Sequence, residues 1–272
     1  MSFPFAKGHG TGNDFIVLPD LDGSVHGGLE PAVVEALCDR RRGLGADGVL
    51  RVVRGDDSAP WVMDYRNADG SVSPMCGNGL RVFARYLVQG GLVDLTKDRL
   101  PLRIATGDGV KLVTYCDDGE ISVDMGEPAV GGWGTVSVDG RTYSARRVDA
   151  GNPHAVAFVD DLGEVGELRE SPYFCGVEFP DGVNVEFVER RSATGLAMRV
   201  YERGVGETAS CGTGACAAVA AAAEELGGVS SSTYTVEVPG GVLTVASDDR
   251  GHQHLKGPAV LVAEGTWTGG PS

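Results

Sequence analysis

The sequence lacks long apolar runs and is poor in basic residues. It contains no stretch near the roughly 20 apolar residues that cross a bilayer. Its first residues, MSFPFAKGHG, have neither the charged start nor the apolar segment of a signal peptide, and we expect a cytoplasmic protein. With 23 Lys and Arg against 38 Asp and Glu, the formal net charge of −15 disfavours nucleic acids and membranes as partners, since both are repelled. A small zwitterionic ligand is compatible with this balance.

The paired CxxC spacing of a zinc site is also missing, and we predict no metal site. The six cysteines of this chain, expected to be intracellular, are therefore predicted to be free thiols rather than a disulfide framework. Four of them have no distinguishing neighbours, and we expect them to be small buried hydrophobic residues. These four are Cys38, Cys116, Cys175 and Cys216.

What the sequence does contain is an internal repeat centred on the other two cysteines. Cys76 opens the run CGNGL and Cys211 opens CGTGA, and the two lie 211 − 76 = 135 positions apart in a chain of 272. The match extends upstream, because Met63 and Met198 stand at the same distance before the two cysteines (76 − 63 = 211 − 198 = 13). A repeat of this period predicts two similar halves that face each other, each with one thiol at the start of a helix.

Short β-like runs between glycine-rich turns dominate the chain, and helical patterns are few. The clearest helix follows Cys76, with apolar residues at helical spacing over 80–88. Its counterpart over 211–226 is nearly all small and apolar, so we expect it to be surrounded by protein. A third helix is expected over 30–42, where Pro at the start and Gly after the end are suitable signals. Residues 252–267 indicate two further strands.

These observations predict an α/β (α+β) fold of two pseudo-symmetric halves. Each half is expected to be a twisted, mostly antiparallel sheet wrapped around a central helix. The predicted N-terminal half, 1–116, carries Cys76, and the predicted C-terminal half, 117–261, carries Cys211. A strand near 262–272 is expected to return to the N-terminal half.

The position of the thiols suggests their chemistry. A helix N-terminus has unpaired N–H groups and a positive dipole end, so the pKa of a thiol there is expected to fall below its free value of about 8.5. The glycines that follow each cysteine leave these N–H groups open to a substrate carboxylate. If the thiols face each other, the pair holds one thiolate and one thiol. A carbon between them can lose a proton to one sulfur and regain one from the other on the opposite side, which inverts its configuration.

Five segments together resemble the diaminopimelate epimerase family. They are GTGNDF (10–15), GLGADG (43–48), NADGSVSPMCGNGLR (67–81), GNPH (151–154) and YERGVGETASCGTGACAA (201–218). The resemblance implies the fold of that family and an isomerase that interconverts LL- and meso-2,6-diaminopimelate, in lysine and peptidoglycan-precursor biosynthesis. It also implies a homodimer that uses neither pyridoxal phosphate nor another cofactor.

The resemblance assigns roles by position, with Cys76 and Cys211 as the two acid/base thiols. Around the reacting carbon it places the N–H groups of Gly77, Asn78, Gly212 and Thr213 and the side chains of Asn13 and Glu202. At the distal amino acid end it places Asn67, Asn152, Asn184 and Arg203, a set able to grip a carboxylate and select one configuration. His154 is similar to a family histidine beside the site. Some members carry glutamine where Gly48 stands, so no contact is assigned to that position.

Three other functions remain open from the residues. The first is another two-thiol amino-acid racemase of this fold, of the proline or hydroxyproline type, which would have no use for Asn67, Asn184 and Arg203. The second is a thiol redox protein, which would need a disulfide for its activity. The third is a binding protein without α-proton exchange. Asparagines are also common turn and cap residues, and histidines are more often structural than catalytic.

Overall fold

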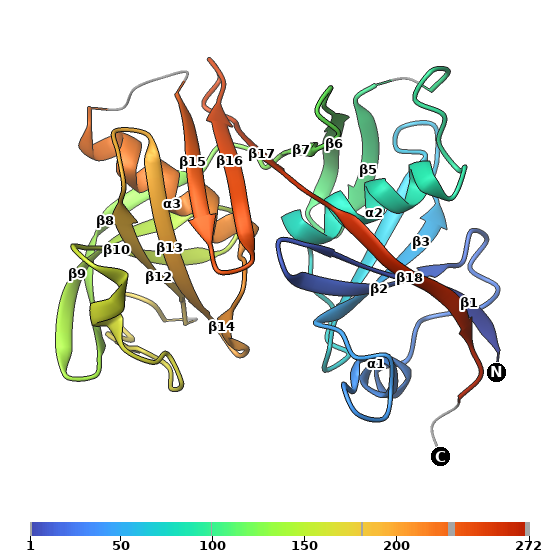
Figure 1. The fold of residues 1–272 in the computed structure, drawn as a ribbon, viewed down its shortest axis with the longest axis horizontal. Coiled ribbons are helices and arrows are strands. Elements are labelled where there is room, and N and C mark those ends of the chain that lie inside the picture. Colours follow the sequence, from blue (N-terminus) through green and yellow to red (C-terminus); the bar gives the residue numbers. More distant parts are fainter. Residues whose placement is uncertain (1, 99, 181, 228–231, 270–272) are drawn as a thin grey trace. The chain divides into compact units, whose positions relative to one another are not determined.

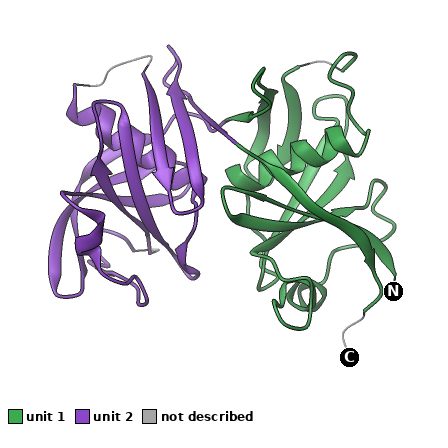
Figure 2. Ribbon diagram, in the orientation of Figure 1, with its two compact units in different colours: residues 1–123, 258–272 green, residues 124–257 purple. Residues whose placement is uncertain are grey.

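The computed structural model describes residues 2–98, 100–180, 182–227 and 232–269, which form two compact units (Figure 2). Unit 1 consists of residues 1–123 and 258–272, and unit 2 consists of residues 124–257. The sequence-based division after residue 116 falls in the turn of a hairpin, because β6 (Gly109–Tyr115) pairs with β7 (Ile121–Asp124). Of the segment expected to return to the N-terminal half, residues 270–272 lie outside the described residues.

Unit 1 is a curved sheet that lies around the helix α2 (Gly77–Gln89) (Figure 1). Its other elements are β1 (Phe3–Gly10), β2 (Asn13–Pro19), α1 (Pro31–Cys38), β3 (Gly48–Arg54), β4 (Trp61–Asn67), β5 (Leu102–Thr106) and β18 (Val260–Trp267). The strands follow the order β18-β1-β2-β3-β4-β5-β6-β7, and only the pairs β2–β3 and β4–β5 are parallel. Helix α2 contacts β1, β2, β3, β4, β6 and β18, so one helix fills the concave side of the sheet.

Unit 2 repeats this arrangement around α3 (Gly212–Glu225). Its other elements are β8 (Ala129–Val138), β9 (Arg141–Asp149), β10 (Pro153–Val159), η1 (Leu162–Val165), β11 (Tyr173–Phe174), β12 (Asn184–Arg190), β13 (Gly195–Glu202), β14 (Gly206–Thr208), β15 (Thr233–Val238), β16 (Gly241–Ser247) and β17 (Gln253–Gly257). The order β8-β9-β10-β12-β13-β15-β16-β17 has the same alternation, with β10–β12 and β13–β15 as the parallel pairs. The predicted fold class is confirmed.

The two helices bury different kinds of surface, as their sequences indicate. The apolar residues Leu80, Phe83 and Leu87 of α2 are fully buried against the sheet, and each such side chain contributes about 1.5–3 kcal/mol relative to an exposed position. In α3 every residue from Ala215 to Ala222 is buried, so this helix is surrounded by protein as expected. Arg81 of α2 is also fully buried, although the sequence places it on a different face from the apolar residues.

Two sequence-based expectations were wrong in detail. The helix expected over 30–42 ends at Cys38, because the Asp39 carboxylate accepts hydrogen bonds from the N–H groups of Arg41 and Arg42 and turns the chain. All six cysteines are free and Cys38 and Cys216 are buried, but Cys116 and Cys175 are only half-buried because both lie in turns. The two strands expected over 252–267 are present as β17 and β18.

None of the helices in the described part of the chain has the length and apolar character needed to span a membrane. Within the same residues, no group of three or more His, Cys, Asp or Glu side chains is arranged to hold a metal ion.

Candidate active site

Cys76 is the N-cap residue of α2. Its backbone is extended, with φ −145° and ψ 117°, and its Sγ accepts a hydrogen bond from the Gly79 N–H at 3.4 Å. The N–H groups of Gly77 and Asn78 belong to the same first turn, where a helix has no internal acceptors for them. The half-buried thiol therefore lies where the helix dipole and open N–H groups favour an anion.

Cys211 caps α3 in the same way. Its backbone is extended, with φ −120° and ψ 117°, and its Sγ accepts from the Gly214 N–H at 3.4 Å. Thr213 Oγ1 lies 3.4 Å from the same sulfur. A Cβ atom at Gly214 would lie 2.7 Å from Glu186 Oε1, so a side chain at this position would force the Glu186 carboxylate to move. The predicted pair of helix-capping cysteines is present, one in each unit.

The polar neighbours of Cys76 are amides. Its Sγ lies 3.7 Å from Asn13 Oδ1, and Asn78 Nδ2 donates to the same oxygen at 3.3 Å. Asn78 is buried and accepts from Arg81 Nη2 at 2.8 Å. Unit 1 thus brings Asn13, Gly77 and Asn78 around Cys76, as the family resemblance implies for the reacting end of a substrate.

The neighbours of Cys211 are carboxylates. Burial raises the pKa of Cys211 well above its usual range, and the charges of Glu202 and Glu186 raise it further. Hydrogen bonds from Thr213 and Gly214 lower this pKa, but by less. The expected lowering of this pKa by the helix start is therefore wrong for Cys211, because desolvation disfavours the thiolate more strongly. Burial also raises the pKa of Glu202, while a hydrogen bond from Thr208 Oγ1 works in the other direction.

A chain of hydrogen bonds connects Glu186 to Asn152. Glu186 Oε1 lies 2.7 Å from His154 Nδ1, and His154 Nε2 lies 2.8 Å from Asn152 Oδ1. The contact with His154 occupies the Asn152 oxygen. Both Glu186 and His154 are fully buried.

The remaining unit 2 residues of the predicted set lie at the ends of neighbouring strands: Asn184 begins β12, Asn152 directly precedes β10 and Arg203 directly follows β13. Asn184, at the start of β12, accepts from the Arg203 N–H at 2.9 Å and donates to the Pro153 carbonyl at 3.3 Å. In the parallel pair of β10 and β12, His154 is opposite Asn184, so Asn152, Asn184 and Arg203 gather at one edge of this sheet.

Asn67 and Gly48 are the two further unit 1 positions that the family resemblance singles out. Asn67 ends β4 and donates from Nδ2 to Ser71 Oγ at 2.9 Å in the following turn, which matches the turn role common for asparagine. A Cβ atom at Gly48 would lie 2.5 Å from the Arg66 carbonyl oxygen, so the backbone of Arg66 occupies the space of a side chain there.

Sequence reasoning missed three charged residues close to the site. Glu186 stands inside the apolar run of β12, and a charge within such a run is a signal that a partner is buried beside it. Arg81 and Asp47 stand inside two of the motifs that carry the family resemblance, and nothing in their spacing separates them from surface charges.

The fold has counterparts among solved structures. A hydroxyproline epimerase from Agrobacterium vitis with bound trans-4-hydroxy-L-proline matches with a TM-score of 0.72 over 97% of this chain and 92% of its own, at 16% identity. A likeness at this identity shows the fold alone. The chain thus has this fold, with a cysteine at the start of each central helix.

Sequence comparison shows the family of the chain. The family model described as diaminopimelate epimerase matches residues 5–130 and 146–262, and the chain belongs to this family. A diaminopimelate epimerase from Streptomyces coelicolor is 50% identical over 96% of this chain and 94% of its own length. Another from Thermobifida fusca is 47% identical over 96% of each chain.

Proposed function

We propose that this chain is a diaminopimelate epimerase, which interconverts LL- and meso-2,6-diaminopimelate without pyridoxal phosphate. The observation that carries the proposal is the pair of equivalent thiols. Cys76 and Cys211 cap corresponding helices in two units with the same strand order, and each sulfur accepts from the glycine N–H three residues on. The family membership and the relatives at 47% and 50% identity support this substrate over proline or hydroxyproline.

Inversion at an α-carbon needs a base on one side and an acid on the other. One sulfur, as thiolate, removes the α-proton, and the other, as thiol, returns a proton to the opposite face. The raised pKa of Cys211 makes this sulfur hard to ionise, so its protonated form is favoured before substrate binds. After one turnover the two sulfurs have exchanged protonation states, so the reverse reaction uses them in exchanged roles.

The carbanionic transition state must be stabilised through the substrate carboxylate. The first turns of α2 and α3 offer the N–H groups of Gly77, Asn78, Gly212 and Thr213 for this purpose. Such fixed donors stabilise developing negative charge without reorganisation during the reaction. Asn13 and Glu202, as oxygen acceptors beside the two sulfurs, suit the reacting ammonium group.

The distal amino acid end requires a second set of groups. Asn152, Asn184 and Arg203 at one edge of the unit 2 sheet, together with Asn67, are assigned to it. A guanidinium binds a carboxylate through two parallel donors, and amides both donate and accept. We also assign the enzyme to the cytoplasm, as a homodimer in lysine and peptidoglycan-precursor synthesis.

The proposal is tested by incubating the enzyme with LL-diaminopimelate in heavy water and following the α-carbons by NMR. At early times we expect the meso product to carry one deuteron, at the inverted centre. L-Proline and trans-4-hydroxy-L-proline serve as controls and are expected to show no exchange. Exchange with either of them but not with diaminopimelate would refute the assignment and favour the proline-type racemase.

A further inference from the structure

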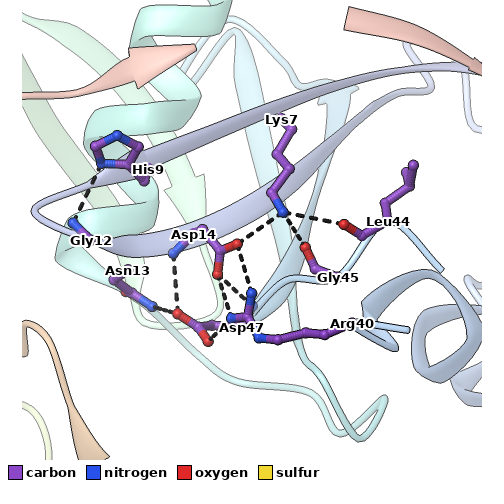
Figure 3. A network of polar contacts seen from close by, with 9 residues as sticks. All are labelled: Lys7, His9, Gly12, Asn13, Asp14, Arg40, Leu44, Gly45 and Asp47. Carbon is purple, nitrogen blue, oxygen red and sulfur yellow. Dashed lines mark hydrogen bonds and ion pairs between the residues drawn. The ribbon is translucent and has the colours of Figure 1, made fainter. Parts of the chain in front are cut away.

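Asn13, the amide beside Cys76, belongs to a chain of hydrogen bonds within unit 1. On one side its Nδ2 donates to Asp47 Oδ2 at 2.8 Å (Figure 3). On the other side its Oδ1 accepts from Asn78 Nδ2 at 3.3 Å and lies 3.7 Å from Cys76 Sγ. The chain ends at Arg81, whose Nη2 donates to Asn78 Oδ1 at 2.8 Å.

The two ends of this chain fix its direction. A guanidinium has only donors and a carboxylate has only acceptors, whereas each amide has one oxygen and one NH₂ group. Asn78 must turn its oxygen to Arg81, and Asn13 must turn its NH₂ group to Asp47. The contact between the two amides agrees with both requirements. The Asn13 side chain therefore presents its acceptor, Oδ1, to Cys76 and not its NH₂ group.

The backbone brings Asn13 and Asp47 together. Asn13 is the first residue of β2, directly after the tight turn of Thr11 (φ 50°) and Gly12 (φ 81°). Asp47 directly precedes β3, and β2 and β3 are parallel with Phe15 opposite Gly48, so both residues stand at the same edge of the sheet. The Asp47 N–H donates to the Asp14 carbonyl at 2.9 Å, and the Asp14 N–H donates to Asp47 Oδ2 at 3.1 Å.

The other oxygen of Asp47 is engaged by a cation. Arg40 Nη2 lies 2.7 Å from Asp47 Oδ1 and 2.7 Å from Asp14 Oδ1, and Lys7 Nζ lies 3.1 Å from Asp14 Oδ2 (Figure 3). Burial acts against the ionised form of Asp14, but hydrogen bonds and charges from Arg40 and Lys7 prevail and hold the pKa of Asp14 below its usual range. With Oδ1 bound to Arg40, Oδ2 is the oxygen that Asp47 offers to Asn13.

We propose that Asp47 is a positioning residue that holds the Asn13 amide with its oxygen toward the Cys76 thiol. In this direction the amide stabilises the protonated thiol, since S–H has an acceptor. In the opposite direction it would donate an N–H to the sulfur and stabilise the thiolate instead. Under the proposed function, on which this second consequence rests, the same oxygen also accepts from the ammonium group at the reacting carbon.

The test measures alkylation of Cys76 by iodoacetamide near neutral pH, read by peptide mapping, so it needs no turnover and no substrate. Asp47→Ala releases the Asn13 amide, the thiol loses its acceptor, and alkylation of Cys76 is expected to become roughly threefold faster, the effect of one weak hydrogen bond. Asp47→Asn keeps the shape and can turn either its oxygen or its NH₂ group to Asn13, so a smaller increase in the same direction is expected. An unchanged rate in both variants would overturn the proposal.

Asp14→Ala is the matched control, since it removes the same charge from the same network but leaves the contact between Asp47 and Asn13. Its alkylation rate is expected to equal that of the parent protein. An increase as large as that of Asp47→Ala would show an effect of charge or of loosened structure and would contradict positioning.

A double-mutant cycle with Asn13→Ala isolates the path through the amide. When Asn13 is absent, Asp47→Ala is expected to have no further effect on the alkylation rate of Cys76. Independent, multiplying effects of the two substitutions would mean that Asp47 acts on the sulfur directly, and the proposal would then be wrong. Because the readout is alkylation, these outcomes are independent of whether the enzyme turns over diaminopimelate.

Discussion

The two cysteines occupy the same backbone frame in opposite electrostatic surroundings. Cys76 is half-buried, and the polar groups near it are amides linked to Arg81 and Asp47. Cys211 is 6% exposed and has the carboxylates of Glu202 and Glu186 close by. The repeat has therefore kept the strand order, the capped helix and the thiol, whereas the groups that set the acidity of each thiol differ. A symmetric scaffold here carries two thiols whose surroundings are unequal before any ligand binds.

Removing either sulfur has the largest expected effect, and it tests whether both units take part in the chemistry. Cys76→Ala and Cys211→Ala are each expected to lower the epimerisation rate by at least about a thousandfold, because general acid–base catalysis at each face is lost. Turnover is followed by NMR, with thermal unfolding as the check on folding. A variant of either kind that retained most of its activity would refute the two-thiol mechanism.

The second-largest effect is expected from loss of the Arg203 guanidinium in unit 2, which we assign to the distal carboxylate of the substrate. Arg203→Met is expected to raise KM for diaminopimelate by roughly a hundredfold, the scale of a charge-assisted pair of hydrogen bonds. The alkylation rates of Cys76 and Cys211 without substrate should stay as they are. Arg250→Met, in an ion pair of the β16–β17 turn, is the matched control and should leave KM unchanged. Normal affinity in the Arg203 variant would remove this residue from the binding set.

A smaller effect compares the two helix starts directly. A Cβ at Gly214 would approach Glu186 Oε1 to 2.7 Å, whereas at Gly79 the nearest atom would be Leu50 Cδ2 at 3.2 Å. We expect Gly214→Ala to cost about 1–3 kcal/mol through overpacking. In Gly79→Ala the tight contact is offset by the higher helix propensity of alanine, worth about 1 kcal/mol. Thermal unfolding of the two variants checks the order, and a larger loss for Gly79→Ala would contradict it.

The smallest expected effect concerns the acidity of Cys211. A nearby carboxylate disfavours the thiolate and so raises the pKa of Cys211; Glu202→Gln removes that charge, and this pKa is expected to fall. In the Cys76→Ala background, the pH midpoint of Cys211 alkylation should move down by up to about one unit, the usual scale for a neighbouring charge. A midpoint that stays in place or moves up would show that the charge of Glu202 does not raise the pKa of this thiol.

Much of the fold follows from local sequence signals, and the exceptions have identifiable causes. The apolar spacing after Cys76 and the small residues after Cys211 indicate the two central helices, and the matched cysteines indicate the repeat. The end of α1 was missed because one side chain, Asp39, terminates it by accepting two backbone N–H groups. Such a contact depends on local geometry that residue patterns do not encode.

The positions of the two thiols could be predicted from the sequence, whereas the charged groups that act on them could not. A helix start is a local feature, so the capping role of Cys76 and Cys211 can be expected from the glycines that follow them. The direction of the Cys211 pKa shift depends instead on burial and on Glu186, which β12 contributes from a distant part of the sequence. The orientation of Asn13 likewise depends on Asp47, which the parallel pairing of β2 and β3 brings beside it.

The position of β18 in the sequence, after all of unit 2, has a consequence for synthesis of the chain. In unit 2, β9 lies between β10 and β8, and β8 precedes β9 in the sequence; in unit 1, β1 lies between β2 and β18, and β18 follows all of unit 2. When a ribosome has produced residues 1–257, the described strands of unit 2 have therefore been made, while β1 is paired with β2 alone and leaves an open edge to which other chains can associate. Limited proteolysis of ribosome-bound chains should find unit 2 protected first, and protection of unit 1 ahead of it would contradict this order.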